Sequence, residues 1–299
     1  MNYSEWHQIA QQAGLNEISS ATLLSSSIVS QSWQLTTTDG RQYWARTCLA
    51  RHQAVIECEV ENISALRHAG VSTADIITQG KTNKTAWLVC RWQALLSSSP
   101  SMQQIKAELH RLHQQTPKRD TYGWAHANDI NGLLQSNQWL SDWGSFYRSQ
   151  RILPQLRKAK EKGLAQRHID NLESQLAQDF DALFENYQPT PCLVHGNLYL
   201  SPPKQTLDGA VFFYHPACYV GDAEVDQAAV LLAHHRDDLI KGEGSDLMLT
   251  LSIETQLRLS WYQLYYALVE FNLMAQQDTR LIEVLVDQIQ LSHHIHNLT

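Results

Sequence analysis

The chain has 299 residues, a formal charge of −7 and a sequence pI of about 6.0, with 43% hydrophobic and 18% charged residues. This composition is typical of a globular fold with a hydrophobic core, and the acidic balance argues against nucleic acid as a partner. No apolar run approaches the ~20 residues that a membrane span requires, so no membrane partner is expected. The five cysteines show no CxxC spacing, and the first residues lack a basic start and an apolar stretch. We therefore expect reduced thiols, no signal peptide and a cytoplasmic protein.

The first part of the chain predicts a small sheet accompanied by helices. Residues 3–13 have the spacing of a short amphipathic helix, and residues 53–68 have that of a longer one. Strand-like composition and alternation occur in five segments, at residues 22–28, 31–37, 41–48, 75–79 and 86–92. The Asp39–Gly40 pair between the second and third of these segments predicts a hairpin turn.

The helix predicted for residues 53–68 carries an acidic residue on its buried face. Ile56, Val60 and Ile63 fall at helical spacing and form that face, which they share with Glu59. A carboxylate on a buried face usually needs a cationic partner. We therefore expect Glu59 to form an ion pair inside the first lobe.

The chain divides into two predicted lobes joined by a linker. Residues 1–92 form the N-terminal lobe, residues 93–101 a serine-rich linker, and residues 102–299 a mostly helical C-terminal lobe. Helices are expected at residues 101–115, 138–159, 165–186, 222–238, 247–276 and 278–297. The segment 116–137 has no clear period and predicts a long ordered loop. The expected fold class is α+β, with a small five-stranded antiparallel sheet in the first lobe.

Aromatic residues at helical spacing predict core packing in the second lobe. They are Trp139, Trp143, Phe146 and Tyr147 in one segment and Tyr262, Tyr265, Tyr266 and Phe271 near the end of the chain. Such stripes are more often core than ligand site, so we expect both sets to be buried.

Residues 192–226 concentrate the polar groups that could perform chemistry. Two short apolar runs, 192–194 and 210–214, each end at a histidine followed by a turn former, in His195–Gly196 and His215–Pro216. We expect these runs to form a hairpin over residues 192–216 whose loop presents polar side chains to one cleft. Loops often carry chemistry because neighbouring strands hold them in place.

Several motifs in this order resemble the fructosamine kinase (ketosamine-3-kinase) family, which is close to the aminoglycoside and choline kinases. They lie at 26–33, 43–46, 56–63 (IECEVENI), 109–113, 137–155, 195–202 (HGNLYLSP), 214–226 (YHPACYVGDAEVD) and 261–273 (WYQLYYALVEFNL). The resemblance covers nearly the whole chain and implies a protein-kinase-like two-lobe fold. It also implies ATP and Mg²⁺ as cofactors, and transfer of the ATP γ-phosphate to a sugar hydroxyl of a ketoamine.

The resemblance assigns each part of the phosphotransfer machinery to a residue of this chain, and several of these residues have unsuitable chemistry. The loop aspartate that accepts the hydroxyl proton falls on Asn197, whose amide nitrogen only donates. The two magnesium ligands fall on Pro202, which has no side-chain oxygen, and on His215, a poor ligand for a hard cation. The phosphate-binding lysine falls on Arg46, which keeps the charge but not the shape of an ammonium group.

Other positions are altered less. The glycine turn falls on Ser26 and Ser27, which compromises close approach of the backbone to phosphate, whereas Glu59 remains. The resemblance gives His195 a structural role in the loop and places Tyr199 beside the transfer site, where it could stack on a sugar-like substrate. Loss of a general base alone costs roughly 10²–10⁴-fold in rate. We therefore predict a pseudokinase that binds a small molecule, either a nucleotide or a glycated amine; the sequence identifies no protein partner.

Three alternatives stay open. One is an active kinase that phosphorylates ketoamines with a rearranged metal site built from Asp208, Asp222 or Glu224. Another is nucleotidyl transfer with inverted ATP on the same fold, although no acid replaces the metal ligand at residue 215. The third is a transition-metal or histidine-based enzyme, for which the candidate residues are His195, His215, His293, His294 and His296.

Overall fold

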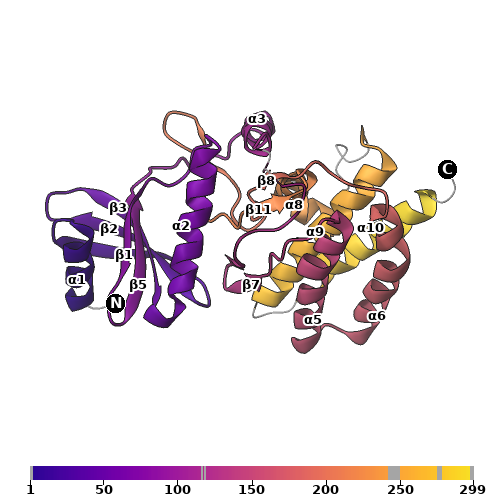
Figure 1. The fold of residues 1–299 in the computed structure, drawn as a ribbon, viewed down its shortest axis with the longest axis horizontal. Coiled ribbons are helices and arrows are strands. Elements are labelled where there is room, and N and C mark those ends of the chain that lie inside the picture. The colour runs from indigo at the N-terminus through magenta and orange to yellow at the C-terminus, as the bar shows by residue number, and fades with distance from the viewer. Residues whose placement is uncertain (1–2, 116, 118, 242–249, 275–277, 297–299) are drawn as a thin grey trace. The chain divides into compact units, whose positions relative to one another are not determined.

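The computed structural model describes residues 3–115, 117, 119–241, 250–274 and 278–296, whose helices and strands are labelled in Figure 1. The chain forms two compact units. Unit 1 comprises Met1–Leu112, Asn128–Leu134 and Pro203–Ala217, and unit 2 comprises His113–Ala127, Gln135–Pro202 and Cys218–Thr299. Among the described helices, none combines the length and the apolar composition needed to cross a membrane.

Unit 1 is built around a five-stranded antiparallel sheet with the strand order β1-β2-β3-β5-β4. Its strands are β1 (Ile18–Ser26), β2 (Ser30–Thr37), β3 (Gln42–Leu49), β4 (Ile76–Lys81) and β5 (Thr85–Arg91). The predicted sheet is confirmed, although β1 begins earlier than predicted. The predicted turn joins β2 to β3, where Gly40 adopts a φ of 80° and its amide donates to the carbonyl of Thr37 at 2.9 Å.

Helices α1 (Tyr3–Ala13) and α2 (Gln53–His68) cover opposite faces of this sheet (Figure 1). A short 3₁₀ helix, η1 (Ala50–His52), leads from β3 into α2. The core on the α1 side includes Trp6, Ile9, Trp33, Trp87 and Val89. The core on the α2 side includes Ile56, Ile63, Leu88 and Cys90. Because successive residues of β5 point to opposite faces, this strand supplies both cores and is buried on both sides.

Unit 1 reaches past the predicted lobe of residues 1–92. It also contains most of α3 (Met102–His113) and two returning segments. These carry the short strands β6 (Asn128–Ile130), β9 (Lys204–Gln205) and β10 (Val211–Phe212), and the first two residues of β7 (Leu133–Gln135). The side-chain amide of Asn62 on α2 holds both returning segments, because it donates to Asn128 Oδ1 at 3.2 Å and to the Pro216 carbonyl at 3.1 Å. These segments lie far along the chain, so composition alone could not assign them to this unit.

The hairpin predicted over residues 192–216 is wrong in its pairing. β8 (Cys192–Val194) pairs with β11 (Tyr219–Gly221) in unit 2, whereas β10 pairs with β9 in unit 1. A tight turn accounts for the second pairing: the Gly209 amide donates to the Thr206 carbonyl at 2.9 Å and turns the chain back on itself. Each pairing involves only two or three residues of each strand, so the strand sequences specify their partners weakly.

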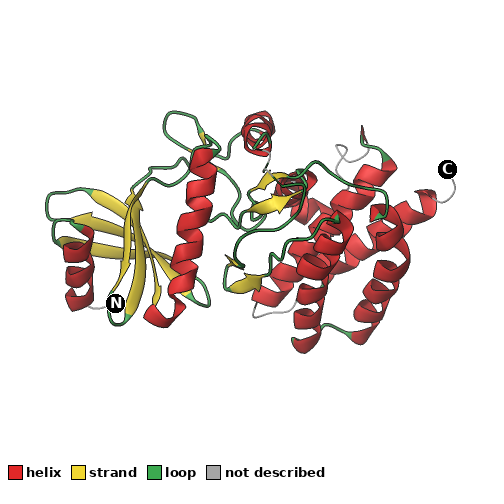
Figure 2. Ribbon diagram, viewed as in Figure 1, coloured by secondary structure: helices red, strands yellow, loops and turns green. Residues whose placement is uncertain are grey.

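Unit 2 is mostly helical, as Figure 2 shows in red. Its helical segments are α4 (Trp143–Tyr147), η2 (Arg148–Ile152), α5 (Leu153–Glu161), α6 (Gln166–Gln175), η3 (Leu176–Phe180), α7 (Asp181–Phe184), α8 (Glu224–Ile240), α9 (Ile253–Leu273) and α10 (Arg280–His296). The helix predicted from residue 138 begins only at Trp143, because Asp142 caps it by accepting the Ser145 amide at 2.7 Å. Residues 247–249, 275–276 and 297 of the predicted helices lie outside the described residues.

The predicted aromatic core of unit 2 is confirmed with one exception. Seven of the eight aromatic side chains are at most 2% exposed, namely Trp143, Phe146, Tyr147, Tyr262, Tyr265, Tyr266 and Phe271. Trp139 is 37% exposed, because it precedes the first turn of α4 and does not share the buried face of that helix. The buried rings pack α4 against α9, with Trp143 and Tyr147 both in contact with Tyr262.

Candidate functional site

Arg46 on β3, the position that the resemblance gives to the phosphate-binding lysine, is buried in unit 1. Its Nε donates to Ser30 Oγ at 3.1 Å, one terminal nitrogen pairs with Glu59 Oε2, and the other lies 3.4 Å from Asp129 Oδ1. Arg46 is 6% exposed and Glu59 is 4% exposed. Burial would raise the pKa of Glu59, but the charge of Arg46 and the hydrogen bonds from His215 and Arg46 lower it below its usual value. The ion pair expected for Glu59 is thus confirmed.

Asp129 is a member of this cluster that the sequence did not reveal. It lies on β6, within the segment predicted only as a loop without a period, and its Oδ1 also accepts the Gly132 amide at 3.2 Å. Burial raises the pKa of Asp129, while Arg46 acts in the opposite direction. Two carboxylates therefore share one guanidinium group, and the charge of Arg46 is balanced inside the unit.

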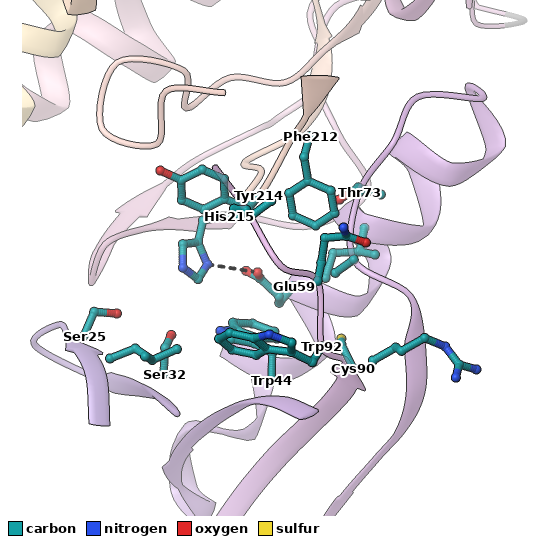
Figure 3. A pocket seen from close by; sticks show the side chains of 16 residues that line it. Ser25, Ser32, Trp44, Glu59, Thr73, Cys90, Trp92, Phe212, Tyr214 and His215 are labelled. Atoms are coloured by element: carbon teal, nitrogen blue, oxygen red, sulfur yellow. Dashed lines mark hydrogen bonds and ion pairs between the residues drawn. The ribbon is translucent and has the colours of Figure 1, made fainter. Parts of the chain in front are cut away.

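His215 reaches the same carboxylate from the segment that follows β10. Its Nδ1 lies 3.2 Å from Glu59 Oε1, as the dashed line in Figure 3 marks, and its ring centroid lies 5.6 Å from that of Trp44. The backbone of His215 has a φ of 50°, in the left-handed region that non-glycine residues rarely adopt. The structure thus places the imidazole as an internal partner of Glu59.

The serine turn between β1 and β2 uses its own side chains to satisfy its backbone. The Ser27 hydroxyl accepts the amides of Val29 and Ser30 at 3.4 and 3.1 Å, and the Ser27 amide donates to the Ser30 carbonyl at 2.8 Å. The Ser26 hydroxyl is directed at the Ser27 carbonyl at 3.5 Å. Amides of a turn can bind phosphate only when they are open to it. In this turn a serine oxygen occupies two of them.

A pocket of about 220 Å³ lies within unit 1, beside this cluster (Figure 3). Glu59 and His215 are among the residues that line it, whereas Arg46 is not. Its aromatic lining residues are Trp44, Trp92, Phe212, Tyr214 and His215. The alternation of β3 predicts that Trp44 and Arg46 share one face of the strand, but no sequence signal indicated that Phe212 and Tyr214 would face them. The part of the pocket's wall that comes from residues 212–215 was therefore not predictable from the sequence.

In unit 2, the loop at residues 195–202 is anchored by a buried aspartate. Asp226, at the start of α8, accepts the backbone amides of His195 and Gly196 at 2.7 and 2.9 Å, and its Oδ2 lies 3.0 Å from His113 Nε2. Burial would raise the pKa of Asp226, but the hydrogen bond and charge of His113, with His195 and Gly196, hold it below its usual value. The His195 ring also accepts the Asn197 amide on Nδ1 at 3.3 Å, and its structural role in the loop stays a prediction.

Asn197, at the predicted base position, is 2% exposed and faces the interior of the loop. Its side-chain nitrogen donates to Ser201 Oγ at 3.3 Å, and its backbone amide donates to His195 Nδ1 at 3.3 Å. Pro202, at the position predicted for a magnesium ligand, is half-buried and offers no side-chain donor atom. The described side chains of this loop therefore include no carboxylate.

Tyr199, the predicted substrate residue, is 9% exposed and tied into unit 2. Its hydroxyl donates to Glu270 and accepts from Arg236 Nε at 3.1 Å, and Arg236 also pairs with Glu270 at 2.7 Å. The Tyr199 ring lies 5.9 Å from that of Tyr266. The stacking of Tyr199 on a substrate stays a prediction, and the sequence did not indicate Arg236 or Glu270 as its partners.

The carboxylates that a rearranged metal site would need have other partners. Asp222 accepts the hydroxyls of Tyr262 and Tyr187 at 2.6 and 3.1 Å, and burial raises its pKa to about 6. Glu224 forms a two-point ion pair with Arg258 at 2.8 Å. Asp208 accepts the Thr206 hydroxyl. Across the described ranges, no group of three or more His, Cys, Asp or Glu side chains is placed to hold a metal ion.

The residues that the resemblance assigns to phosphoryl transfer thus have defined partners within unit 1 or within unit 2. Comparison with known proteins identifies the family of the chain. The model of the family described as fructosamine kinase matches residues 1–292. A probable ketoamine kinase of Vibrio parahaemolyticus is 27% identical over 294 residues, which cover 95% of this chain and 99% of that relative.

Solved structures show the same fold. A fructosamine-3-kinase candidate from Haemophilus somnus 129PT has a TM-score of 0.77 at 22% sequence identity, covering 96% of this chain and 97% of that one. A macrolide 2′-phosphotransferase type I has a TM-score of 0.57 at 12% identity, covering 96% of each chain. The α+β fold predicted from the sequence, a small antiparallel sheet followed by a helical part, is therefore the protein-kinase-like fold. Because the family model matches almost the whole length, this chain belongs to the fructosamine kinase family.

Proposed function

We propose that this chain is a pseudokinase of its family, which binds a small molecule but does not catalyse efficient phosphoryl transfer from Mg-ATP. The observation that carries the proposal is the chemistry of Asn197, Pro202 and His215, at the positions that the resemblance assigns to the base and the two metal ligands. None of these side chains is a carboxylate, and Mg²⁺ prefers oxygen ligands. These three residues do not fit a magnesium ion, and we derive no step through one.

The surroundings of the nucleotide-cleft residues support the proposal. A working kinase also pairs this cation with a helix glutamate, but Arg46 lies 3.4 Å from a second carboxylate, Asp129, with which an incoming phosphate would compete. The turn amides of Val29 and Ser30 already donate to Ser27 Oγ. Phosphoryl transfer depends on cationic side chains and N–H groups placed around the phosphates. In this chain the Arg46 guanidinium and the two turn amides already have other partners.

The family supports a small molecule as the ligand. The relatives found are described as ketoamine kinases, and solved structures of similar fold include a fructosamine-3-kinase candidate. A ketoamine or a nucleotide is therefore the ligand class that we propose. The five cysteines, all among the described residues, form no disulfide with one another, which supports a cytoplasmic location as part of the proposal.

Thermal unfolding tests this proposal. We expect that ATP with Mg²⁺ raises the melting temperature no more than ATP with a chelator, because the residues at the metal positions supply no carboxylate oxygen. The measurement is the melting temperature of the natural protein over a series of ATP concentrations, with MgCl₂ in one arm and EDTA in the other. Ligand binding raises the melting temperature by mass action, so an intact metal site would separate the two arms. A shift seen only with Mg²⁺ would contradict the proposal.

A further inference from the structure

A second hollow in unit 1, of about 450 Å³, is distinct from the pocket of Figure 3. It is bounded by Arg67 at the C-terminal end of α2, the loop of residues 70–73, Glu108 and Arg111 on α3, and Val211 at the start of β10. Among the described residues that line it, Thr73 alone also borders the other pocket. Its volume is within the roughly 300–1,000 Å³ of a usual ligand cleft, so this Arg67–Arg111 hollow can hold a small molecule.

Three arginine side chains share two carboxylates around the Arg67–Arg111 hollow. Arg67 Nη1 pairs with Asp75 Oδ1 at 3.0 Å, and the other oxygen of Asp75 pairs with Arg91 Nε at 3.1 Å. Arg111 Nη1 lies 3.6 Å from Glu108 Oε2, farther than the roughly 2.7–2.9 Å of a charge-assisted hydrogen bond. These five side chains therefore leave one positive charge unbalanced, which favours an anion in the hollow.

Both arginines that line the hollow keep hydrogen-bond donors for a ligand. The side chains of Arg67 and Arg111 are 47% and 57% exposed. Their Nη1 atoms donate to the carbonyls of Ala74 at 3.3 Å and Gly70 at 3.5 Å, whereas Nε and Nη2 of both donate to no described residue. A guanidinium group is a planar fork that binds phosphate oxygens in pairs. Two such forks, one from α2 and one from α3, thus border the same hollow.

The loop between α2 and β4 adds a buried hydroxyl to the wall of the hollow. Thr73 is 8% exposed, and its hydroxyl has no hydrogen-bond partner among the described residues. A buried hydroxyl without a partner is costly, and an oxygen atom of a ligand could accept its hydrogen bond. The loop is held in place, because the Phe213 amide donates to the Ser72 carbonyl at 2.9 Å and Phe213 forms a β-bridge with Thr73. Space remains beside Gly70, where an added Cβ atom would meet nothing within 4 Å.

We propose that the Arg67–Arg111 hollow binds a phosphate group, either as inorganic phosphate or as the phosphate of a small monoester. The two guanidinium forks hold its charged oxygens, and the Thr73 hydroxyl donates a further hydrogen bond. A phosphate offers more acceptor oxygens than a carboxylate, which suits donors that come from three places in the chain. The helix dipole at the end of α2 disfavours an anion, but its effect is smaller than that of a charge-assisted hydrogen bond. The site uses none of the residues at the base and metal positions, so it is independent of the proposed function.

The test titrates the full chain with inorganic phosphate, glucose 6-phosphate and glucose at constant ionic strength, without nucleotide or Mg²⁺. Calorimetry measures affinity, and amide NMR signals locate the site. We expect both phosphates to bind saturably and to shift the Gly70 and Ser72 amides, and glucose to have no effect. Tighter binding of glucose 6-phosphate than of inorganic phosphate would identify a monoester as the ligand, and equal or weaker binding would identify free phosphate. A lack of saturable phosphate binding, or shifts of the Val29 and Ser30 amides instead, would overturn the proposal.

Arginine variants test the two forks. Arg67→Met and Arg111→Met should each weaken phosphate binding at least about tenfold, the effect of losing a charge-assisted hydrogen bond. Because both side chains are exposed at the surface of the unit, these changes should cost little stability, and melting temperatures check this. Arg41→Met is the matched control, since it removes another exposed, paired arginine of unit 1 and should leave phosphate binding unchanged. Equal phosphate affinity in all three variants would overturn the proposal.

Two further positions test the direction of the predicted effects. Thr73→Val should weaken phosphate binding about fivefold, whereas Thr73→Ser, which keeps the hydroxyl, should bind as the natural protein does. Glu108→Gln should tighten phosphate binding about threefold, because it removes the carboxylate that competes for Arg111. Equal affinity of the two Thr73 variants, or weaker binding in Glu108→Gln, would overturn the assigned contacts.

Discussion

Arg46→Met is expected to lower the free energy of unfolding by about 3–5 kcal/mol, the usual effect of removing one partner of a buried ion pair. The variant leaves Glu59, 4% exposed, without its ion pair to Arg46 and in contact with His215 Nδ1 at 3.2 Å. Methionine retains most of the aliphatic volume, so the loss would come from the uncompensated carboxylate and not from a cavity. Equilibrium urea unfolding, followed by tryptophan fluorescence, measures the effect.

A double variant and a surface control make this result specific. Arg46→Met combined with Glu59→Gln removes both charges and should recover at least half of the lost stability. Arg41→Met breaks an ion pair with Asp39 at 3.3 Å whose arginine side chain is 74% exposed, and it should cost less than about 1 kcal/mol. If Arg46→Met lowers the free energy of unfolding as little as Arg41→Met does, the buried Arg46–Glu59 pair does not stabilise the packing of β3 against α2.

Asp226→Asn is expected to cost about 3 kcal/mol of stability, because the carboxylate makes charge-assisted hydrogen bonds that an amide cannot all replace. The aspartate accepts the His195 and Gly196 amides and lies beside His113. The side-chain NH₂ group of an asparagine would face one of these donors, and it cannot accept a hydrogen bond from it. Urea unfolding measures the loss, and hydrogen exchange of the His195 and Gly196 amides shows whether the loop itself is released.

The loss of stability in Asp226→Asn should depend on pH in a defined direction. The pKa of Asp226 in the folded state is lower than its unfolded value of about 3.9. The ionised carboxylate therefore stabilises the fold fully above the unfolded pKa, and this stabilisation is lost as the pH falls through the folded-state pKa. The difference in stability between the natural protein and Asp226→Asn should thus be smaller in strong acid than at neutral pH. Asp237→Asn, on the same helix but with a side chain 78% exposed, should change stability by less than about 0.5 kcal/mol at any of these pH values. A comparable loss in both variants would contradict the anchoring role of Asp226.

Helix α2 shows how far sequence reasoning reaches in this chain. The predicted bounds, 53–68, match α2 (Gln53–His68), and the one glutamate on the buried face does have a cationic partner. Helical spacing over four turns is a strong signal, because only one register buries the apolar side chains. The sheet was predictable for the same reason, since alternation and the turn at Gly40 are local features.

The pocket and its charge cluster show where such reasoning stops. Asp129 lies in a segment without a period, and Phe212 and Tyr214 flank Phe213, whose amide donates to the Ser72 carbonyl at 2.9 Å. These contacts join residues far apart in the chain, and no local pattern records them. The hairpin predicted over 192–216 failed for this reason as well, because β8 pairs with a strand that follows the predicted hairpin.

Only the family resemblance indicates that the base and the two metal ligands are replaced in this chain, by Asn197, Pro202 and His215. The structure adds their surroundings: Asn197 bonds to Ser201 within its loop, and His215 bonds to Glu59 on α2. Asn197 is buried within its loop, whereas His215 is partly exposed, lines the pocket of unit 1 and contacts Glu59 through Nδ1. These contacts give the pseudokinase proposal a physical basis beyond residue identity.

Transfer of labelled γ-phosphate from Mg-ATP to a ketoamine, prepared by glycating lysine with glucose, tests the central claim most directly. We predict no transfer above the background without protein, and none from Asn197→Asp either, because one carboxylate restores the base position but not the metal ligands. Phosphorylated ketoamine that forms with the natural protein and disappears when EDTA is added would contradict the account.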